Sequence, residues 1–312
     1  LCPEAADALA PYVRAGAVPF SDANANSLHT PGRTAFSALE AARADIASSV
    51  GARPDEIIFT SCSSEANNAA IDGIAKAAEA ARRIRAGGRT PQIIISALEH
   101  DSVLAPAKRL VREGFRLDIL PVDALGHVSP EALDARMTED CVLVSIQLAN
   151  GEVGPIQPIA ELARTAHAAG ALFHTDATQA LGKLTVDLHA LSVNAASFSG
   201  HKVGGPKGVG FLFLKARTPY QALILGGGQE STRRSGTQNV PGIVAMAAAV
   251  KAAVSLQKEE SARLRELRDR LYADACALPR VHPTIDVPRG SVEHLPNIVN
   301  LHVDGCEGPT LV

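Results

Sequence analysis

The sequence predicts an α/β fold with a mostly parallel central sheet, helices on both of its faces, and a smaller, incomplete C-terminal α+β domain. Between residues 55 and 215, short β-branched runs alternate with alanine-rich helical stretches, a pattern typical of a parallel sheet covered on both sides. Over residues 240–278 a helical pattern changes from apolar to charged, as expected of a helix that leaves the main core. Residues 294–303 then have the pattern of a strand.

Short apolar and β-branched runs predict the strands of the main sheet. These runs are residues 56–60, 92–96, 116–120, 142–147, 172–176, 195–198 and 209–214. Helices are expected between them, because apolar residues recur there at three- and four-residue spacing and Asp, Ser or Pro stands near several starts. The expected helices are residues 66–86, 103–113, 130–137 and 159–169.

Chain length and composition indicate a large globular core. With 312 residues and 46% hydrophobic content, the chain can bury a sizeable interior. We expect a large domain at residues 12–245 and a small domain at residues 246–312 with 1–11, lacking its C-terminal part. Residue 1 is leucine, and residues 307–312 resemble the first turn of a helix without a stop signal. We therefore expect the sequence to be a fragment, truncated at both ends.

Charge and cysteine usage exclude several classes of protein. A net charge of -3 and a pI near 6.4 give no overall attraction to nucleic acid or to anionic membranes. No apolar run approaches the roughly 20 residues that a membrane-spanning helix needs. The five cysteines show no C-x-x-C pairing, which predicts neither a disulfide framework nor a zinc site. Without a visible signal peptide, we expect a soluble cytoplasmic protein with no nucleic-acid, membrane or metal partner.

The segment SFSGHKVGGPKGVGFLFLK (197–215) sets Lys202 in a glycine-rich turn between two apolar runs. Partial desolvation lowers the pKa of a lysine from about 10.4, and the neutral amine can form a Schiff base. Ser199 and His201 stand beside Lys202 and are suited to binding an anion. A β-hairpin with a solvated lysine has the same pattern, so Lys202 alone does not decide between a catalytic and a structural role.

A hydroxyl-rich turn follows the first predicted strand. Residues 61–64 are SCSS, and a helix is expected to begin near Glu65. Such a turn offers free backbone N–H groups and the positive end of the helix dipole, which together bind phosphate. Ser63 and Ser64 are the candidate ligands, and an ordinary serine N-cap is the alternative.

Asp176 stands at the carboxyl end of a predicted buried strand, where open α/β sheets hold their ligands. A carboxylate buried there needs a cationic partner. If that partner is a pyridinium nitrogen, the ring becomes an electron sink, and Gln179, three residues on, is placed to reach the phenolic oxygen of the ring. A helix cap at Asp176 is the alternative.

His100 and Asn150 also follow predicted strands. An imidazole can stack on a planar ring and shuttle protons, and an asparagine side chain can bond both a ring oxygen and a substrate carboxylate. Taken alone, His100 suits a structural role equally well, and the Asn-Gly pair suits a plain turn. Together with Lys202, Asp176 and the serine turn, they supply what pyridoxal 5′-phosphate requires of a protein.

Longer motifs resemble the cysteine desulfurases of the NifS/IscS group, which are pyridoxal-phosphate enzymes of fold type I in the class V aminotransferase family. The similar segments include NANSLHTPGR (24–33), EIIFTSCSSEANNAAIDG (56–73), LANGEVGPIQPI (148–159), HTDATQALGKL (174–184), SFSGHKVGGPKGVG (197–210) and RRSGTQN (233–239). The resemblance implies a homodimer that converts L-cysteine to L-alanine. It would pass the sulfur to an acceptor or scaffold protein, for iron-sulfur cluster or thio-cofactor synthesis.

The resemblance also implies a role for each site residue. Lys202 would hold pyridoxal phosphate as a Schiff base and transfer protons, with assistance from His100, which stacks on the ring. Asp176 would pair with the ring nitrogen, Gln179 would contact the phenolic oxygen, and Asn150 would face cofactor and substrate. The phosphate would be bound by Ser63, Ser64, Ser199, His201 and, from the neighbouring subunit, Thr237.

The chain departs from the family pattern in three places. A strand and an ATTP-like turn that precede this region in the family are missing, and Cys62 stands where the family usually has glycine. The loop with the persulfide-forming cysteine and the substrate-binding arginine would lie beyond residue 312, and Cys306 is not its equivalent. We therefore expect weak cofactor binding and no sulfur transfer by this chain alone. The alternatives are a selenocysteine lyase or other β-lyase of the same fold, or a non-catalytic scaffold.

Overall fold

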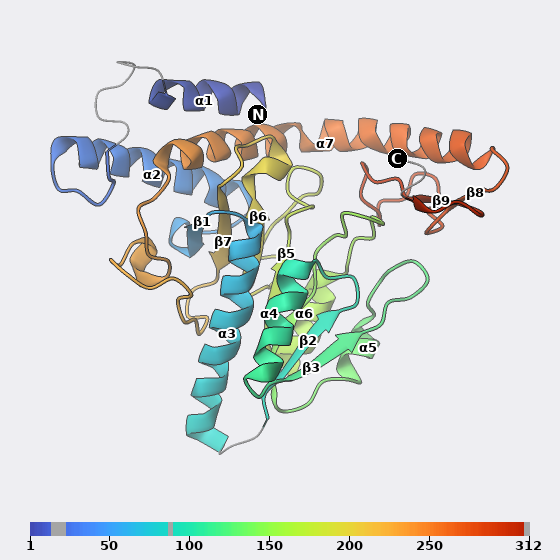
Figure 1. Cartoon of the computed structure of the whole chain (residues 1–312), viewed down its shortest axis with the longest axis horizontal. Helices are drawn as coiled ribbons and strands as arrows, with labels where there is room; N and C mark the ends of the chain where they lie inside the picture. Colours follow the sequence, from blue (N-terminus) through green and yellow to red (C-terminus); the bar gives the residue numbers. More distant parts are fainter. Residues whose placement is uncertain (14–22, 87–89, 309–312) are drawn as a thin grey trace.

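The computed structural model describes residues 1–13, 23–86 and 90–308 and is built around a seven-stranded sheet (Figure 1). Its strands are β1 (Ile57–Thr60), β2 (Gln92–Ser96), β3 (Arg116–Leu120), β4 (Cys141–Ser145), β5 (Leu172–Asp176), β6 (Ala195–Ser199) and β7 (Gly210–Leu214). They lie in the order β1-β7-β6-β5-β4-β2-β3. In this sheet only β7 runs antiparallel to its neighbours, so the predicted mostly parallel α/β fold is confirmed.

Helices cover both faces of the sheet. One face is covered by α3 (Ser63–Ala86) and α4 (Asp101–Arg112), and the other by α2 (Thr30–Ser49), α6 (Ile159–Ala168) and α7 (Val240–Cys276). Within β2, Ile93 and Ile95 join the core under α3 and α4, whereas Ile94 joins the opposite core. Successive strand residues point to opposite faces. A strand buried on both faces therefore has the continuous apolar pattern seen in the sequence.

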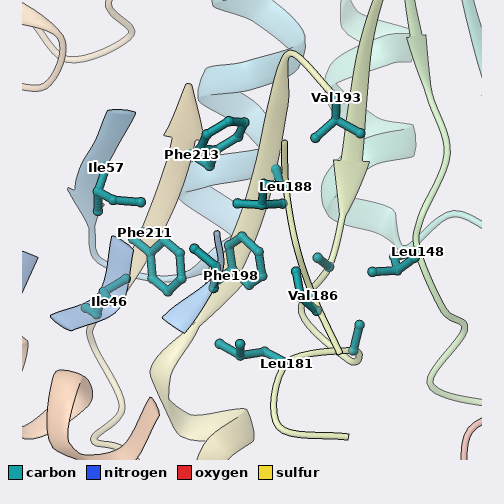
Figure 2. Close-up of a cluster of buried hydrophobic side chains, with 14 of the residues drawn as sticks. Ile46, Ile57, Leu148, Leu181, Val186, Leu188, Val193, Phe198, Phe211 and Phe213 are labelled. Atoms are coloured by element: carbon teal, nitrogen blue, oxygen red, sulfur yellow. The ribbon is translucent and has the colours of Figure 1, made fainter. Parts of the chain in front are cut away.

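A phenylalanine cluster fixes the hairpin formed by β6 and β7 (Figure 2). The rings of Phe198 and Phe211 stack with their centroids 4.4 Å apart, and Phe213 lies in the same core. Ile46 of α2 and Ile57 of β1 complete this part of the core. The turn between β6 and β7 carries Lys202, so the cluster anchors both ends of the segment that presents this lysine.

The long helix α7 lies along α1 (Pro3–Val13) and α2 (Figure 1). It spans 37 residues and contains an 18-residue window with a mean hydropathy of 1.5. By length and composition it is the one helix in the described ranges that could cross a membrane, which corrects the expectation that no apolar run is long enough. Of that window 44% is buried, and Ala245 and Ala249 pack against Ala5. These contacts are those of a core helix.

Several elements differ from the sequence-based expectation. Neither α1 nor α2 was predicted, and α5 (Pro130–Asp134) ends earlier than expected. The strand predicted at residues 294–303 is confirmed only for β9 (Leu301–Val303), which pairs with β8 (Val281–Pro283). Pro296 interrupts the earlier part, because proline has no N–H to donate to a ladder. The division into two domains stays a prediction, and most of the helical turn expected at residues 307–312 lies outside the described residues.

Candidate active site

A cavity of about 610 Å³ opens at the carboxyl ends of β2, β4, β5 and β6, beside the first turn of α3. Its walls include most of the predicted site residues: Ser63, Ser64, His100, Asn150, Asp176, Gln179, His201 and Lys202. The expectation that these strand ends converge on one place is confirmed. Of the predicted site residues, only Ser199 and Thr237 do not line the cavity.

Asp176 is 9% exposed and ends β5 at the cavity wall. One carboxylate oxygen accepts a hydrogen bond from the Asn67 amide at 2.7 Å, and the other accepts one from the Thr178 backbone N–H at 2.9 Å. Residues 178–180 form a turn and no helix follows Asp176, so the helix-cap alternative is wrong. Within the described ranges Asp176 makes no salt bridge, and burial lowers the pKa of nearby His174 to about 4. The carboxylate thus lacks a cationic partner of its own.

His100 is the N-cap of α4. Its Nδ1 accepts a hydrogen bond from the Ser102 backbone N–H at 3.0 Å, and the Ser102 hydroxyl lies 2.8 Å from the same nitrogen. His100 therefore has the structural role that the sequence allowed, as the N-cap of α4. It also serves the site, because the cap fixes an exposed imidazole ring at the cavity wall.

Ser63 and Ser64 form the first turn of α3. The first backbone N–H groups of a helix have no intrahelical acceptor, and here the residues that carry them line the cavity. Cys62, at the position where the family usually has glycine, is not among the described residues with positive φ. A cysteine therefore fits this turn without backbone strain.

Lys202 lies in the short helix η2 (Gly200–Val203), which Gly204 ends with a φ of +83°. Ser199 stands behind it and bonds Nδ1 of His201 at 2.8 Å. Burial lowers the pKa of His201, and the charge of Lys202 adds to this effect. Burial and the charge of Lys202 also lower the pKa of Lys183 to about 8. Lys202 itself is exposed, which differs from the expected desolvation, and it lines the same cavity as the N-terminus of α3, an arrangement that suits an anionic group.

Asn150 organises the turn that closes another wall. Its side-chain oxygen accepts from the backbone N–H groups of Glu152 and Val153, each at 2.8 Å, and its amide donates to the Leu98 carbonyl at 3.2 Å. The second amide N–H has no acceptor in the part of the chain that the structure describes and is available to a ligand. Asn150 can therefore stabilise the turn through its side-chain oxygen and still bind a ligand through its amide. Gly151 lies so close to Gln179 that a Cβ would meet its amide nitrogen at 2.6 Å.

Glu99, which was not singled out from the sequence, also lines the cavity. Its Oε1 accepts from the Ser96 hydroxyl at 2.5 Å and from the Gln147 backbone N–H at 2.9 Å. Its Oε2 is buried and has no hydrogen-bond partner among the residues described. Burial, together with the charge of Asp176, raises the pKa of Glu99 to about 8. Glu99 could have been identified from the sequence, because it directly precedes His100 in the segment that follows β2.

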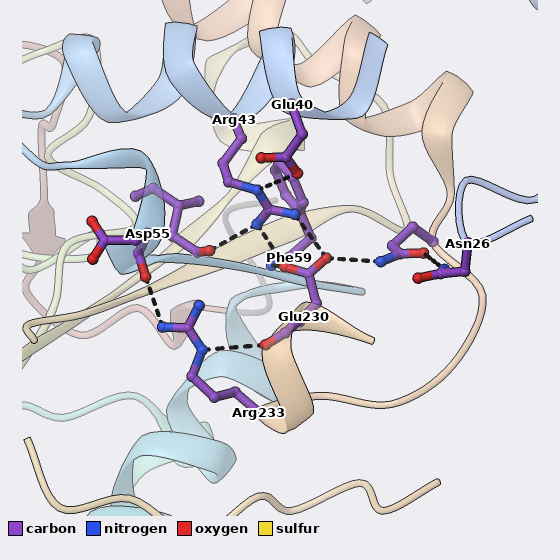
Figure 3. A network of polar contacts seen from close by, with 9 residues as sticks. Asn26, Glu40, Arg43, Asp55, Phe59, Glu230 and Arg233 are labelled. Atoms are coloured by element: carbon purple, nitrogen blue, oxygen red, sulfur yellow. Dashed lines mark hydrogen bonds and ion pairs between the residues drawn. The ribbon is translucent and has the colours of Figure 1, made fainter. Parts of the chain in front are cut away.

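Thr237 is exposed and lies in the loop of residues 226–239, apart from the cavity walls. A polar network anchors this loop to α2 and β1 (Figure 3). Its centre is Glu230, which accepts hydrogen bonds from the Arg43 guanidinium at 2.7 and 3.0 Å. The contact of Thr237 with a neighbouring subunit's cofactor stays a prediction.

Comparison with known proteins identifies the family. The model of the family described as Aminotransferase class-V matches residues 5–310. A cysteine desulfurase IscS from Dictyoglomus turgidum is 40% identical over 290 residues, which cover 93% of this chain and 71% of the relative. Its counterpart from Serratia proteamaculans is 41% identical over 291 residues, covering 92% and 69%.

Solved structures agree with the sequence relatives. A NifS-like protein superposes with a TM-score of 0.90 at 36% identity, covering 99% of this chain and 80% of that one. DndA from Streptomyces lividans superposes with a TM-score of 0.81 at 35% identity, covering 95% and 79%. The resemblance to the NifS/IscS cysteine desulfurases and the fold type are confirmed, and this chain belongs to the class V aminotransferase family.

Proposed function

We propose that this chain is a pyridoxal-phosphate-dependent cysteine desulfurase that removes sulfur from L-cysteine. The observation that carries the proposal is the buried Asp176 carboxylate, which has no cationic partner within the described ranges and lines the same cavity as Lys202. Burying an unpaired carboxylate is costly. A protonated pyridine nitrogen would supply the missing positive charge.

The residues present fit the cofactor group by group. Asp176 would hold the ring nitrogen, Gln179 would bond the phenolic oxygen, and the His100 ring would cover one face. The phosphate would be bound by the first turn of α3 with Ser63 and Ser64, by His201 with Ser199 behind it, and by Thr237 of a neighbouring subunit. Once bound, pyridoxal phosphate supplies an electron sink for the α-carbon of the substrate.

Lys202 has two tasks in this proposal. Its amine would hold the cofactor covalently, and the same amine, once free, would move the α-proton of the substrate. Asn150 keeps one amide N–H for the substrate carboxylate.

The thiol that takes the sulfur comes from outside the described cavity walls, since none of their residues is a cysteine. We infer a sulfur acceptor or scaffold protein as partner, a homodimer as the working form, and a cytoplasmic role in iron-sulfur cluster or thio-cofactor synthesis. The similar proteins named above as cysteine desulfurases support L-cysteine as the substrate over L-selenocysteine.

The test is an absorbance spectrum of the purified chain with pyridoxal phosphate, compared between Lys202→Ala and a matched control, Lys207→Ala. Lys207 is exposed in the same turn and does not line the cavity. We expect the shifted band of the lysine-bound cofactor in the wild type and in Lys207→Ala, a change of that band on addition of L-cysteine, and no such band in Lys202→Ala. Identical spectra for Lys202→Ala and the wild type would sink the proposal.

A further inference from the structure

Four polar side chains form a continuous hydrogen-bonded path, whose two ends, His100 and Asp176, line the cavity. The Asn67 amide nitrogen lies 2.7 Å from Asp176 Oδ2 and 2.8 Å from the Ser102 hydroxyl. The same hydroxyl lies 2.8 Å from His100 Nδ1. Asn67 is fully buried on α3, and Ser102 is buried in the first turn of α4. The path therefore links the carboxylate on β5 to the imidazole before α4 through two helices.

The chemistry of each group sets the direction of the bonds. Asn67 donates one amide N–H to Asp176 and the other to Ser102, while its carbonyl oxygen is buried without a partner in the described part of the chain. The reversed amide would place that oxygen against the Asp176 carboxylate, where two acceptors face each other. Asp176 needs a hydrogen-bond donor, and this need orients the Asn67 amide. As a result, the Asn67 carbonyl oxygen has no hydrogen bond.

The oxygen of Ser102 accepts from Asn67, so its hydroxyl hydrogen is free for His100. The Ser102 backbone N–H also points at His100 Nδ1, at 3.0 Å. Nδ1 is therefore approached by two donors and must offer its lone pair to both. A proton on Nδ1 would face the backbone N–H that caps α4. The ring proton consequently lies on Nε2.

We propose that Asn67 and Ser102 are positioning residues that link Asp176 to His100 and hold His100 as the tautomer protonated on Nε2. The inference rests on the proposed function where it concerns the reaction. His100 then offers an N–H at its free nitrogen and has no lone pair there to accept a proton. Movement of the α-proton falls to Lys202 alone, and His100 serves as a stacking ring and hydrogen-bond donor.

The test is a two-bond ¹H–¹⁵N spectrum of the full chain with ¹⁵N-labelled histidine, recorded before and after addition of pyridoxal phosphate. The chain has 10 histidines, so the His100→Gln spectrum identifies the signals of His100. In the wild type we expect His100 protonated on Nε2. In Ser102→Ala one of the two donors to Nδ1 is lost, and the ratio of the Nδ1-protonated to the Nε2-protonated form should rise about fivefold, as expected for one net hydrogen bond.

Asn67→Leu, of similar side-chain volume, removes the hub of the path and should shift the His100 signals in the same direction. Asn68→Ala is the matched control, because within the described ranges the Asn68 amide donates to the backbone carbonyls of Ser64 and Ser102 and to no side chain of the path. Ser102→Ala removes a single hydroxyl and keeps the test decisive if Asn67→Leu fails to fold. A wild-type proton on Nδ1, or a Ser102→Ala spectrum equal to that of Asn68→Ala, would overturn the inference. The spectrum recorded without cofactor does not depend on the proposed function, whose failure would show only in the Lys202→Ala absorbance comparison.

Discussion

Replacing Glu230 with glutamine would leave the guanidinium of Arg43 buried without its main carboxylate (Figure 3). Arg43 is 7% and Glu230 6% exposed, and they form two hydrogen bonds of 2.7 and 3.0 Å. Glu230 also accepts from the Phe59 backbone N–H at 2.9 Å and from the Gln238 amide at 3.1 Å. Breaking a buried ion pair by removing one partner costs about 3–5 kcal/mol. Because glutamine keeps one acceptor oxygen, we expect Glu230→Gln to lower the free energy of unfolding by about 3 kcal/mol.

The backbone around Glu230 explains why the pair is needed. Glu230, Ser231 and Thr232 have φ values of 48°, 56° and 67°, a left-handed conformation that costs a non-glycine residue roughly 1–2 kcal/mol. Such strain persists only where surrounding contacts impose it. The pair with Arg43 supplies those contacts and so holds the loop that carries Thr237.

The effect depends on pH in a defined direction. Burial opposes ionisation of Glu230, but the hydrogen bonds and charge of Arg43 more than offset it, so the pKa lies below its usual value. A group with a lowered folded pKa contributes stability above its unfolded pKa, about 4.3 for glutamate, and loses it as the pH falls through the folded pKa. The difference between wild type and Glu230→Gln should be full at pH 7 and shrink below about pH 4.

The assay is urea unfolding followed by far-ultraviolet circular dichroism, since the chain has no tryptophan. Glu40→Gln is the matched control, because Glu40 pairs with the same arginine at 3.0 Å but has a side chain that is 40% exposed. Its loss should cost about 0–1 kcal/mol, as for a surface pair. Equal unfolding free energies for Glu230→Gln and Glu40→Gln would refute the reasoning.

Two further predictions concern the cavity and its support. Burial raises the pKa of Glu99 to about 8. The folded chain therefore keeps a proton that the unfolded chain releases above about pH 4.3. As a result, the free energy of unfolding falls as the pH rises from about 4.3 to about 8. Glu99→Gln should flatten that fall in thermal unfolding across this range, and an unchanged slope would speak against a buried neutral acid. At Gly154, φ is +91° and an added Cβ would run into the His294 ring, so Gly154→Ala should destabilise by at least about 2 kcal/mol. Gly114→Ala is its control, because Gly114 has a φ of +96° with open space around it; equal losses of stability would show that the contact with His294 is unimportant.

The sheet could be predicted from the sequence because its strands are short segments rich in apolar and β-branched residues between turn residues. Residues 92–96, 116–120 and 172–176 match β2, β3 and β5 to the residue. Prediction failed where tertiary contacts decide. The helix α2 has small residues on its buried side, such as Ala35 and Ala42, and a mixed pattern of this kind is a weak helical signal.

The site followed from a single topological rule, namely that parallel strands present their carboxyl ends at one edge. This rule placed His100, Asn150, Asp176 and Lys202 in one cavity although they are far apart in the chain. The rule does not identify residues that act from inside a helix. Asn67 looks like an ordinary helical residue, and its contact with Asp176 spans 109 positions of sequence.

Asp176 and Glu99 are two of the three acidic residues that line the cavity, the third being Glu152, and their charges would repel each other if both were ionised. Asp176 and Glu99 both line the cavity, and the charge of Asp176 contributes to the raised pKa of Glu99. If both were ionised, a single ring nitrogen would not balance them. Burial keeps Glu99 protonated at pH 7, whereas Asp176 has the donors Asn67 and Thr178 on its two oxygens. The two acids therefore differ in their surroundings: burial favours the protonated form of Glu99, and two donors fix the carboxyl group of Asp176 at the cavity wall.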